Sequence, residues 1–387
     1  MTEPRRNVWR VLHVSPSVAR RDGGPVEALR GFILSLGDEG IAADVVATDK
    51  GLAGSESLDD LPIVELFHAR PPYSWTFSPG MLSRMDDLVQ EYDLVHIHGL
   101  DTFPGSVAMR ACRKRDVPFV LEPHGSLDIF HHHERWLRKF VYRASVDRAN
   151  LRACRGFVVS SERERSHGRK NLLTTPDQRW WVVGLGVDAR LFALQQSRAR
   201  DAAHDLVVLF LGRVTAKKNL DLVLRGVAIA RERGVDVCLK VAGPIDPALE
   251  WNPIELIRDL GLGPYVEMLG QVDRDDREAL LSSADVFVLP SEDESFGVAM
   301  AEALAAGTLV VASAEVGIAP EAAAAGAAML CETNATSIAD RLEWIDGNGR
   351  EATAMRNRAR QYASERFEWS RAARSLAAVY AEVLEAT

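Results

Sequence analysis

Short apolar runs alternate with longer amphipathic segments from one end of the chain to the other. The runs are rich in Val, Leu, Ile and Phe, which is typical of strands buried on both faces of a parallel sheet. We predict eleven such strands, at residues 8–14, 43–47, 94–97, 119–122, 156–159, 180–183, 206–211, 237–242, 266–269, 286–289 and 309–312.

The segments between these runs have the period of amphipathic helices. The clearest of them lie at residues 25–37, 105–115, 220–233, 274–283 and 298–306. Because strand-like and helix-like segments alternate, the sequence predicts an α/β fold of doubly wound sheets with helices on both faces.

Eleven strands are too many for one comfortable open sheet. The alternation pauses at residues 188–204, a polar stretch rich in Arg and Gln. The length of 387 residues also suits two domains, since domains commonly hold about 100 to 200 residues. We therefore predict one domain over residues 1–187 and a second over residues 188–365.

The composition is that of an ordinary globular protein, with 47% hydrophobic and 26% charged residues, and it excludes disorder. The net charge of −9 argues against nucleic-acid binding through bulk charge. The four cysteines form no CxxC pair, which favours a reducing compartment. With no signal-peptide pattern and no apolar stretch of about 20 residues, we expect a cytoplasmic protein, either free or peripheral at the inner face of the cell membrane.

The segment PSEDESFGVAMAEALAAG, residues 290–307, joins a strand to a helix through a polar loop. Gly297 permits a tight turn, and the helix start behind it favours an anion such as a diphosphate. Glu294 lies in the loop, and Glu302 follows inside an otherwise apolar helix. A buried carboxylate needs hydrogen bonds, so Glu302 either holds a polar ligand or pairs with a neighbouring helix.

The segment FLGRVTAKKNLD, residues 210–221, is a second strand-to-helix loop. It presents Arg213 and Lys218, two cations suited to a diphosphate at a strand's carboxyl end. A solvated basic turn is the alternative for the pair, and we assign that role to Lys217.

Three features of the first half are candidates for chemistry. RRDGGP at residues 20–25 places Gly23 and Gly24 between a strand and a helix, without the GxGxxG of a dinucleotide site. FVLEPHG ends in His124, an imidazole placed to bond a hydroxyl or polarise a reacting group. His96, His98 and residues 131–133 resemble metal ligands, but no carboxylate or thiolate follows at matching spacing, so we predict no metal. In the second half of the chain, we interpret DRD, residues 273–275, as a helix cap.

Residues 131–154 form a locally basic stretch in which Trp136, Phe140 and Tyr142 are interleaved with Arg and Lys. Such a stretch suits an anionic membrane surface or a charged acceptor. The alternative is a surface helix whose aromatic side chains point inward.

Taken together, these motifs resemble the retaining glycosyltransferases of family 4, which have the GT-B fold of two facing Rossmann-like domains with a cleft between them. The resemblance covers nearly the whole chain and rests on the order of its motifs: GGP (23–25), DLVHIHGL (93–100), PHGSLD (123–128), VVSSERE (158–164), GLGVD (184–188), GRVTAKK (212–218) and ESFGVAMAE (294–302). The end of the chain, residues 366–387, is similar to the helix that crosses back to the first domain in this family. The PHGSLD form is most similar to members that build bacterial surface polysaccharides.

The resemblance implies a role for each motif residue. Arg213 and Lys218 would hold the donor's diphosphate, Glu294 the hydroxyls of the donor sugar, and Glu302 the nucleotide ribose. On the first domain, the loop at Gly23 and Gly24 would approach the phosphates, and His124 would lie near the reacting sugar. The backbone amides of Phe296, Gly297 and Val298 would complete the cradle.

The implied reaction moves a hexose from a nucleoside-diphosphate sugar, in which the nucleotide is UDP or GDP, to a hydroxyl of a saccharide or lipid-linked saccharide. The configuration of the sugar is retained, and neither a metal nor a cofactor takes part. Two positions depart from the family pattern: Asn219 replaces a usual glycine after the lysine, and Ile318 replaces a second one. A nucleotide-sugar 2-epimerase of the same fold and a non-catalytic sugar-nucleotide-binding protein are the alternatives. A phosphorylase that uses pyridoxal phosphate fits less well.

Overall fold

The computed structural model describes residues 8–52, 58–127, 141–172, 175, 178–194 and 206–386. The chain divides into two compact units. The first unit holds residues up to 186 together with residues from 369 onward, and the second holds residues 187–368.

The sheet of the first unit is parallel throughout and has, among the described residues, seven strands in the order β3-β2-β1-β4-β5-β6-β7. Its strands are β1 (Trp9–Val14), β2 (Ile41–Thr48), β3 (Ile63–Phe67), β4 (Leu94–His98), β5 (Phe119–Glu122), β6 (Gly156–Val159) and β7 (Arg179–Val182). This order is that of a Rossmann fold with one added strand.

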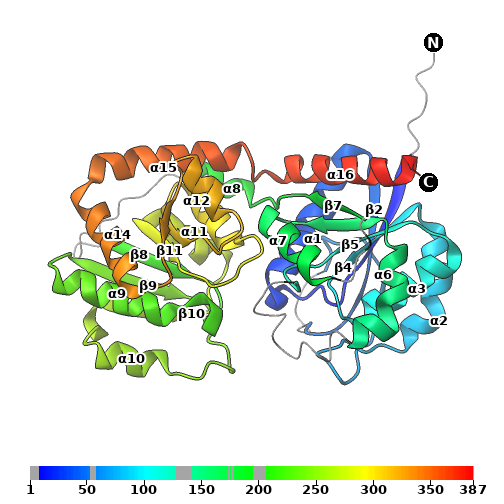
Figure 1. Cartoon of the computed structure of the whole chain (residues 1–387), viewed down its shortest axis with the longest axis horizontal. Helices are drawn as coiled ribbons and strands as arrows, with labels where there is room; N and C mark the ends of the chain where they lie inside the picture. The colour runs from blue at the N-terminus through cyan, green and yellow to red at the C-terminus, as the bar shows by residue number, and fades with distance from the viewer. Residues whose placement is uncertain are drawn as a thin grey trace, which may run out of the picture. The chain divides into compact units, whose positions relative to one another are not determined.

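Helices of the first unit are α1 (Gly24–Leu36), α2 (Gly80–Leu88), α3 (Phe103–Arg115), α6 (Arg148–Ala153), α7 (Glu162–Asn171) and α16 (Trp369–Glu385). The last helix, α16, packs against α1, so the two ends of the chain belong to one unit (Figure 1). Trp369 at the start of α16 lies so close to Gly31 of α1 that a Cβ there would stand 2.1 Å from the indole.

The second unit repeats the arrangement with six parallel strands, among the residues described, in the order β10-β9-β8-β11-β12-β13. The strands are β8 (Leu206–Leu211), β9 (Val237–Ala242), β10 (Val266–Gly270), β11 (Val286–Leu289), β12 (Leu309–Ser313) and β13 (Met329–Cys331). Its helices are α8 (Ala189–Ala193), α9 (Leu220–Glu232), α10 (Pro253–Asp259), α11 (Arg274–Ser283), α12 (Val298–Ala306), α13 (Ala319–Ala324), α14 (Ala335–Gly347) and α15 (Gly349–Ser364).

The predicted doubly wound α/β architecture is confirmed, and each of the eleven predicted runs coincides with a strand to within two residues at either end. Two strands were not predicted. β3 alternates between exposed and half-buried positions at the edge of its sheet, and β13 has only three residues. Neither forms the continuous apolar run by which a buried parallel strand is recognised.

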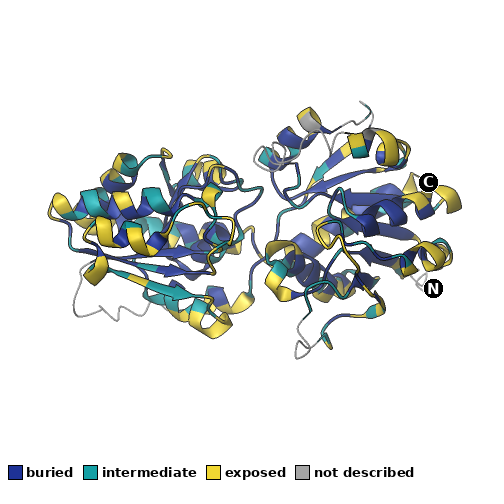
Figure 2. Ribbon diagram, turned by 90° about the horizontal axis from the view of Figure 1, so that it is seen from below, coloured by how far each residue is buried: buried dark blue, intermediate teal, exposed yellow. Residues whose placement is uncertain are grey.

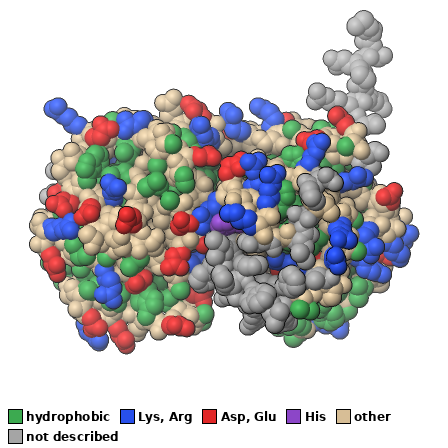
Figure 3. All heavy atoms as spheres, in the orientation of Figure 1, with side chains coloured by type: hydrophobic (Ala, Val, Ile, Leu, Met, Phe, Trp, Pro, Cys, Tyr) green, Lys and Arg blue, Asp and Glu red, His purple; other side chains and the backbone are tan. Residues whose placement is uncertain are grey.

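The central strands are buried in both units, and exposed positions lie on the outer faces of the helices and on the edge strands β3, β7 and β10 (Figure 2). Acidic and basic side chains are interspersed on the face drawn in Figure 3. In the part of the chain that the structure describes, no helix is both long and apolar enough to span a bilayer.

In each sheet the chain winds outward in both directions from one pair of neighbouring strands, β1 with β4 and β8 with β11. At such a switch point the loops after the two strands run to opposite sides, which leaves room for a ligand at the carboxyl ends of the strands. The loops that carry the predicted site residues follow β1, β8, β11 and β5, the neighbour of β4.

Candidate active site

The switch point of the second unit brings two predicted loops together. Arg213 and Lys218 follow β8, and Glu294 follows β11, the strand paired beside it. Lys218 Nζ lies 3.2 Å from Glu294 Oε1, and the two side chains are only 15% and 17% exposed. Arg213 is exposed in the same loop as Lys218. The structure therefore gathers two cations and a carboxylate where a doubly wound sheet binds its ligand.

Backbone and side-chain hydrogen bonds join the same two loops. The amide of Glu292 donates to the carbonyl of Lys217 at 2.8 Å, and Asn219 Nδ2 donates to the carbonyl of Pro290 at 2.9 Å. Asn219 has φ 53° and ψ 45°, the left-handed conformation that a glycine adopts without strain and that Asn tolerates better than most residues. The departure from the family pattern at this position thus keeps the backbone and adds a bond.

Ile318, the second departure, adopts φ −93° and ψ −8°, which any residue can take. Its amide donates to the carbonyl of Phe296 at 3.2 Å. No glycine is required there, because the backbone has no left-handed turn at this position.

The loop that leads into α12 requires a glycine at position 297. Gly297 has φ 98°, and a Cβ on it would lie 2.4 Å from Val316 Cγ1. Gly297 is the N-cap of α12, so the helix begins at Val298, four residues after Glu294. The ring of Phe296 is turned into the unit, 3% exposed, so this residue offers only its backbone to a ligand.

Glu302 lies on α12 with its carboxylate 2.9 Å from the guanidinium of Arg277 on α11. Its side chain is 12% exposed and that of Arg277 is 40% exposed. The pairing with a neighbouring helix, one of the two predicted alternatives, is present, and the exposed Arg277 leaves the carboxylate at the surface of the unit.

In the first unit, Gly23 and Gly24 lie where α1 begins, after β1. Gly23 has φ 75°, and a Cβ built on it would meet nothing within 4 Å. The amides of Val26 and Glu27 donate to the Gly23 carbonyl at 3.0 and 3.1 Å. The glycine is therefore required by its backbone conformation and leaves open space beside the loop.

His124 follows β5 with φ 50°, and its side chain is 9% exposed. Its Nε2 lies 2.8 Å from His98 Nδ1, and its Nδ1 lies 3.4 Å from Glu122 Oε1. The next amide, of Gly125, donates to the buried carboxylate of Glu164 at 2.7 Å. Both imidazole nitrogens thus face neighbours within the unit, so the side chain is held in one orientation.

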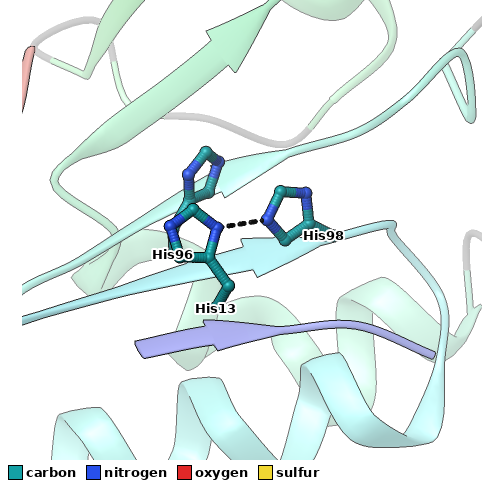
Figure 4. Close-up of side chains that lie close together, drawn as sticks. All are labelled: His13, His96 and His98. Carbon is teal, nitrogen blue, oxygen red and sulfur yellow. Dashed lines mark hydrogen bonds between the residues drawn. The ribbon is translucent and has the colours of Figure 1, made fainter. Parts of the chain in front are cut away.

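His124 belongs to a cluster that the sequence analysis found only in part. The parallel register places His13 beside His96, on the same face of the sheet as His98 (Figure 4). It also places Glu122 beside His98. Tyr380 of α16 completes it, with its hydroxyl 2.6 Å from His96 Nδ1. The carboxylate that we judged missing from the histidine motif is Glu122, at the end of the adjacent strand. Polar residues at alternate positions of buried strands are the signal that could have revealed it.

Burial sets the ionisation of this cluster. It lowers the pKa of each imidazole and raises the pKa of the Glu122 carboxyl to about 7. The ligand atoms of His13, His96 and His98, and those of His98, Glu122 and His124, each lie within 4.8 Å of one another, so either triplet is close enough to be considered for a metal ion.

Other predictions have mixed outcomes. The helix-cap interpretation of Asp273 is confirmed, since its side chain accepts from the amide of Asp276. In the basic stretch, residues 131–140, with Trp136 and Phe140, lie outside the described residues. Arg143 is 4% exposed and binds Asp101 with two hydrogen bonds, and the Tyr142 hydroxyl lies 2.7 Å from Ser106 Oγ. Both side chains bond partners within the unit, as the alternative of inward-pointing aromatic side chains expects, while the membrane role of the stretch stays a prediction.

The histidine cluster should make the protein sensitive to acid. Below about pH 6.5 the unfolded chain takes up protons on these histidines, whereas the folded chain keeps them neutral. The free energy of unfolding therefore decreases as the pH is lowered below that value. Glu122 opposes this, because its raised pKa lets the folded state hold a proton up to about pH 7. Four histidines outweigh one carboxyl, and each excess proton is worth about 1.4 kcal/mol per pH unit.

Denaturant unfolding between pH 5 and 7 measures this slope. In His96→Gln the slope of the unfolding free energy against pH should decrease by the equivalent of up to one proton. In the control His68→Gln, which removes a side chain that is 75% exposed, the slope should be nearly unchanged. Equal slopes in His96→Gln and the wild type would contradict the neutral, buried state of His96.

Comparison with protein families finds two matches that together cover most of the chain. Residues 23–191 match the model "Glycosyltransferase Family 4", and residues 195–364 match the model "Glycosyl transferases group 1". A D-inositol 3-phosphate glycosyltransferase of Corynebacterium aurimucosum is 27% identical over 330 residues, which are 80% of this chain and 76% of that protein.

Solved structures share the fold. HepE of Anabaena, in complex with UDP and glucose, superposes with a TM-score of 0.77 at 20% identity over 97% of this chain and 100% of that one. WaaG, a glycosyltransferase involved in lipopolysaccharide biosynthesis, gives a TM-score of 0.69 at 16% identity over 95% of this chain and 99% of that one. With two doubly wound units, the family's loops at their switch points and matches along nearly its whole length, the chain belongs to glycosyltransferase family 4 and has the GT-B fold.

Proposed function

We propose that this glycosyltransferase takes a hexose from a nucleoside-diphosphate sugar and transfers it with retention of configuration. The observation that carries the proposal is the Lys218–Glu294 pair at the switch point of the second unit. Lys218 and Arg213 would neutralise the diphosphate, and Glu294 would accept hydrogen bonds from the sugar hydroxyls. Glu302 would bond the ribose. The UDP bound in the HepE complex favours UDP over GDP as the nucleotide of the donor.

The positive groups of the second unit suit the departure of a nucleoside diphosphate. As the bond from the sugar to the phosphate breaks, charge grows on the leaving oxygen, and Lys218, Arg213 and the N-terminus of α12 stabilise it. The acceptor hydroxyl attacks from the face that the leaving group vacates, which retains the configuration. His124, as a residue of the acceptor-side unit, would lie at the reacting sugar.

For the acceptor we propose a lipid-linked or growing saccharide of a bacterial surface polysaccharide. The PHGSLD motif and the fold shared with WaaG support this class. The similarity to D-inositol 3-phosphate glycosyltransferases favours a second candidate, a phosphorylated cyclitol. An assay that offers both acceptors with UDP-sugars separates them, and conversion of the donor sugar without any acceptor would instead indicate the epimerase.

Lys218→Ala should lower the turnover of transfer by about 100- to 1,000-fold, because it removes a charge that stabilises the leaving group. Glu294→Ala should cost a similar factor. Both residues lie in loops rather than in the core, so thermal unfolding should change little. The matched control is Lys217→Ala, which removes the neighbouring ammonium from the same loop and should keep at least half of the activity. Near-normal turnover in Lys218→Ala would contradict the site assignment.

Transfer should survive an excess of EDTA, since Arg213, Lys218 and the start of α12 would supply the positive charge that a divalent ion brings elsewhere. The measurement is the initial rate after dialysis against chelator, with and without added Mg²⁺ or Mn²⁺. A rate lost on chelation and restored by either ion would overturn the metal-independent proposal.

If the acceptor is lipid-linked, the basic stretch at residues 131–154 should bring the enzyme to anionic lipid. We expect flotation with anionic but not neutral vesicles, lost at high salt and reduced by Arg138→Glu with Lys139→Glu. Arg169→Glu with Lys170→Glu, an exposed basic pair on α7, is the control for net charge. Equal loss of flotation in both double variants would show that the charge of the chain, not this stretch, attracts the lipid.

A further inference from the structure

Six side chains of the first unit, five of them buried and His124 9% exposed, close into a cycle. They are His13, His96, His98, Glu122, His124 and Tyr380, and we call them the histidine cycle. Four links are hydrogen bonds: Tyr380 Oη to His96 Nδ1 at 2.6 Å, His124 Nε2 to His98 Nδ1 at 2.8 Å, His98 Nε2 to His13 Nδ1 at 2.9 Å, and His13 Nε2 to Tyr380 Oη at 3.4 Å. Glu122 joins the open ends, with Oε2 at 3.3 Å from His96 Nε2 and Oε1 at 3.4 Å from His124 Nδ1.

The number of protons decides whether such a cycle can be complete. Six links need six hydrogens; the tyrosine hydroxyl supplies one and four neutral imidazoles supply four. The sixth must lie on Glu122 or be shared with the imidazole beside it. Among the residues that the structure describes, His96 Nε2 and Glu122 Oε2 are the two cycle atoms that are buried without a hydrogen bond, and they lie 3.3 Å apart. This is one of the two links that the sixth proton can fill.

Completing the cycle also fixes the tautomers. Every member must donate in the same rotational sense, because each imidazole carries one hydrogen and one lone pair. In one sense all four imidazoles carry the hydrogen on Nε2, and in the other all four carry it on Nδ1. The tautomer of His124 is then coupled to the hydroxyl of Tyr380, which does not touch it.

We propose that the histidine cycle is a closed chain of shared protons that sets the tautomer and orientation of His124, with Tyr380 as a positioning residue contributed by the last helix of the chain. The role of His124 at the sugar rests on the proposed function; the cycle itself does not. Burial raises the pKa of Glu122 to about 7, which favours the protonated carboxyl that the cycle needs. The charge of Glu164 also raises the pKa of Glu122. The Glu164 carboxylate itself accepts hydrogen bonds from the backbone amides of Gly125 and Ser160.

A metal ion bound by the same histidines is the competing interpretation. Zinc holds nitrogen ligands at about 2.0 to 2.1 Å, which sets tetrahedral ligands about 3.3 Å apart. His13 Nδ1 and His98 Nε2 are 2.9 Å apart, a hydrogen-bond distance. The geometry therefore favours a shared proton between them.

The test compares Tyr380→Phe with Tyr92→Phe. Each variant loses one hydroxyl from a buried tyrosine of the same unit, but the Tyr92 hydroxyl bonds Asp44 and lies outside the cycle. Imidazole ¹⁵N spectra, with signals assigned by single His→Gln variants, report which nitrogen of each histidine carries the hydrogen. We expect one shared tautomer for all four histidines in the wild type, a changed tautomer ratio at His124 in Tyr380→Phe, and no change in Tyr92→Phe.

Any of three results would overturn the proposal. The first is a mixture of different tautomers among the four histidines of the wild type, and the second is a His124 signal that Tyr380→Phe leaves unmoved. The third is stoichiometric zinc in the purified protein whose removal shifts the same signals. None of these depends on transfer activity, so the spectra remain decisive even if the proposed function fails.

The kinetic part links the cycle to catalysis. Because both ring nitrogens of His124 are engaged in the cycle, the residue would act on the sugar through the placement of its ring. Tyr380→Phe, which misaligns the ring without removing it, should lower kcat by about 10- to 100-fold and shift its pH profile, with the KM for the donor unchanged. Tyr92→Phe should match the wild type. If Tyr380→Phe had a normal kcat and pH profile but altered spectra, the cycle would only stabilise the fold, and the positioning role would be overturned.

Discussion

Parallel pairing of β1 with β4 and of β8 with β11 is the constraint on which both halves of this enzyme depend. Strands buried on both faces leave only their carboxyl ends for polar chemistry, and the switch points separate the loops that follow. The loops that carry Gly23, Arg213, Lys218 and Glu294 follow switch-point strands, and His124 follows β5, the neighbour of β4. The position of the chemistry is therefore a consequence of strand order.

The two units stabilise their polar groups in different ways. In the second unit Lys218 and Glu294 form an ion pair whose side chains keep 15% and 17% of their surface exposed, so a charged ligand can reach it. In the first unit the histidine cycle is almost wholly buried, and a group left there without a partner costs about 1 to 3 kcal/mol. One set of groups is thus exchangeable, and the other is fixed in place.

Local patterns were enough to predict most of the strands and the loops that carry Arg213, Lys218 and Glu294, because each depends on residues close in sequence. The pairing of Glu302 could be narrowed only to two alternatives, since it depends on the helix packed against α12. The histidine cycle could not be predicted, because His96 and Tyr380 are 284 residues apart and meet only once sheet register and helix packing are known. Glu122 was overlooked for the same reason: its partners lie on other strands.

The return of α16 to the first unit has a consequence for how the protein is made. Residues 187–368 lie between the two parts of that unit, so the first unit is interrupted in sequence although it is continuous in space. Domains generally fold in order as they leave the ribosome. Here the second unit is fully synthesised before the first can bury α16 and acquire Tyr380. Assembly of the buried polar face of the first unit therefore waits until α16 has been synthesised, after the whole of the second unit, so the domain whose synthesis begins first is completed after its neighbour.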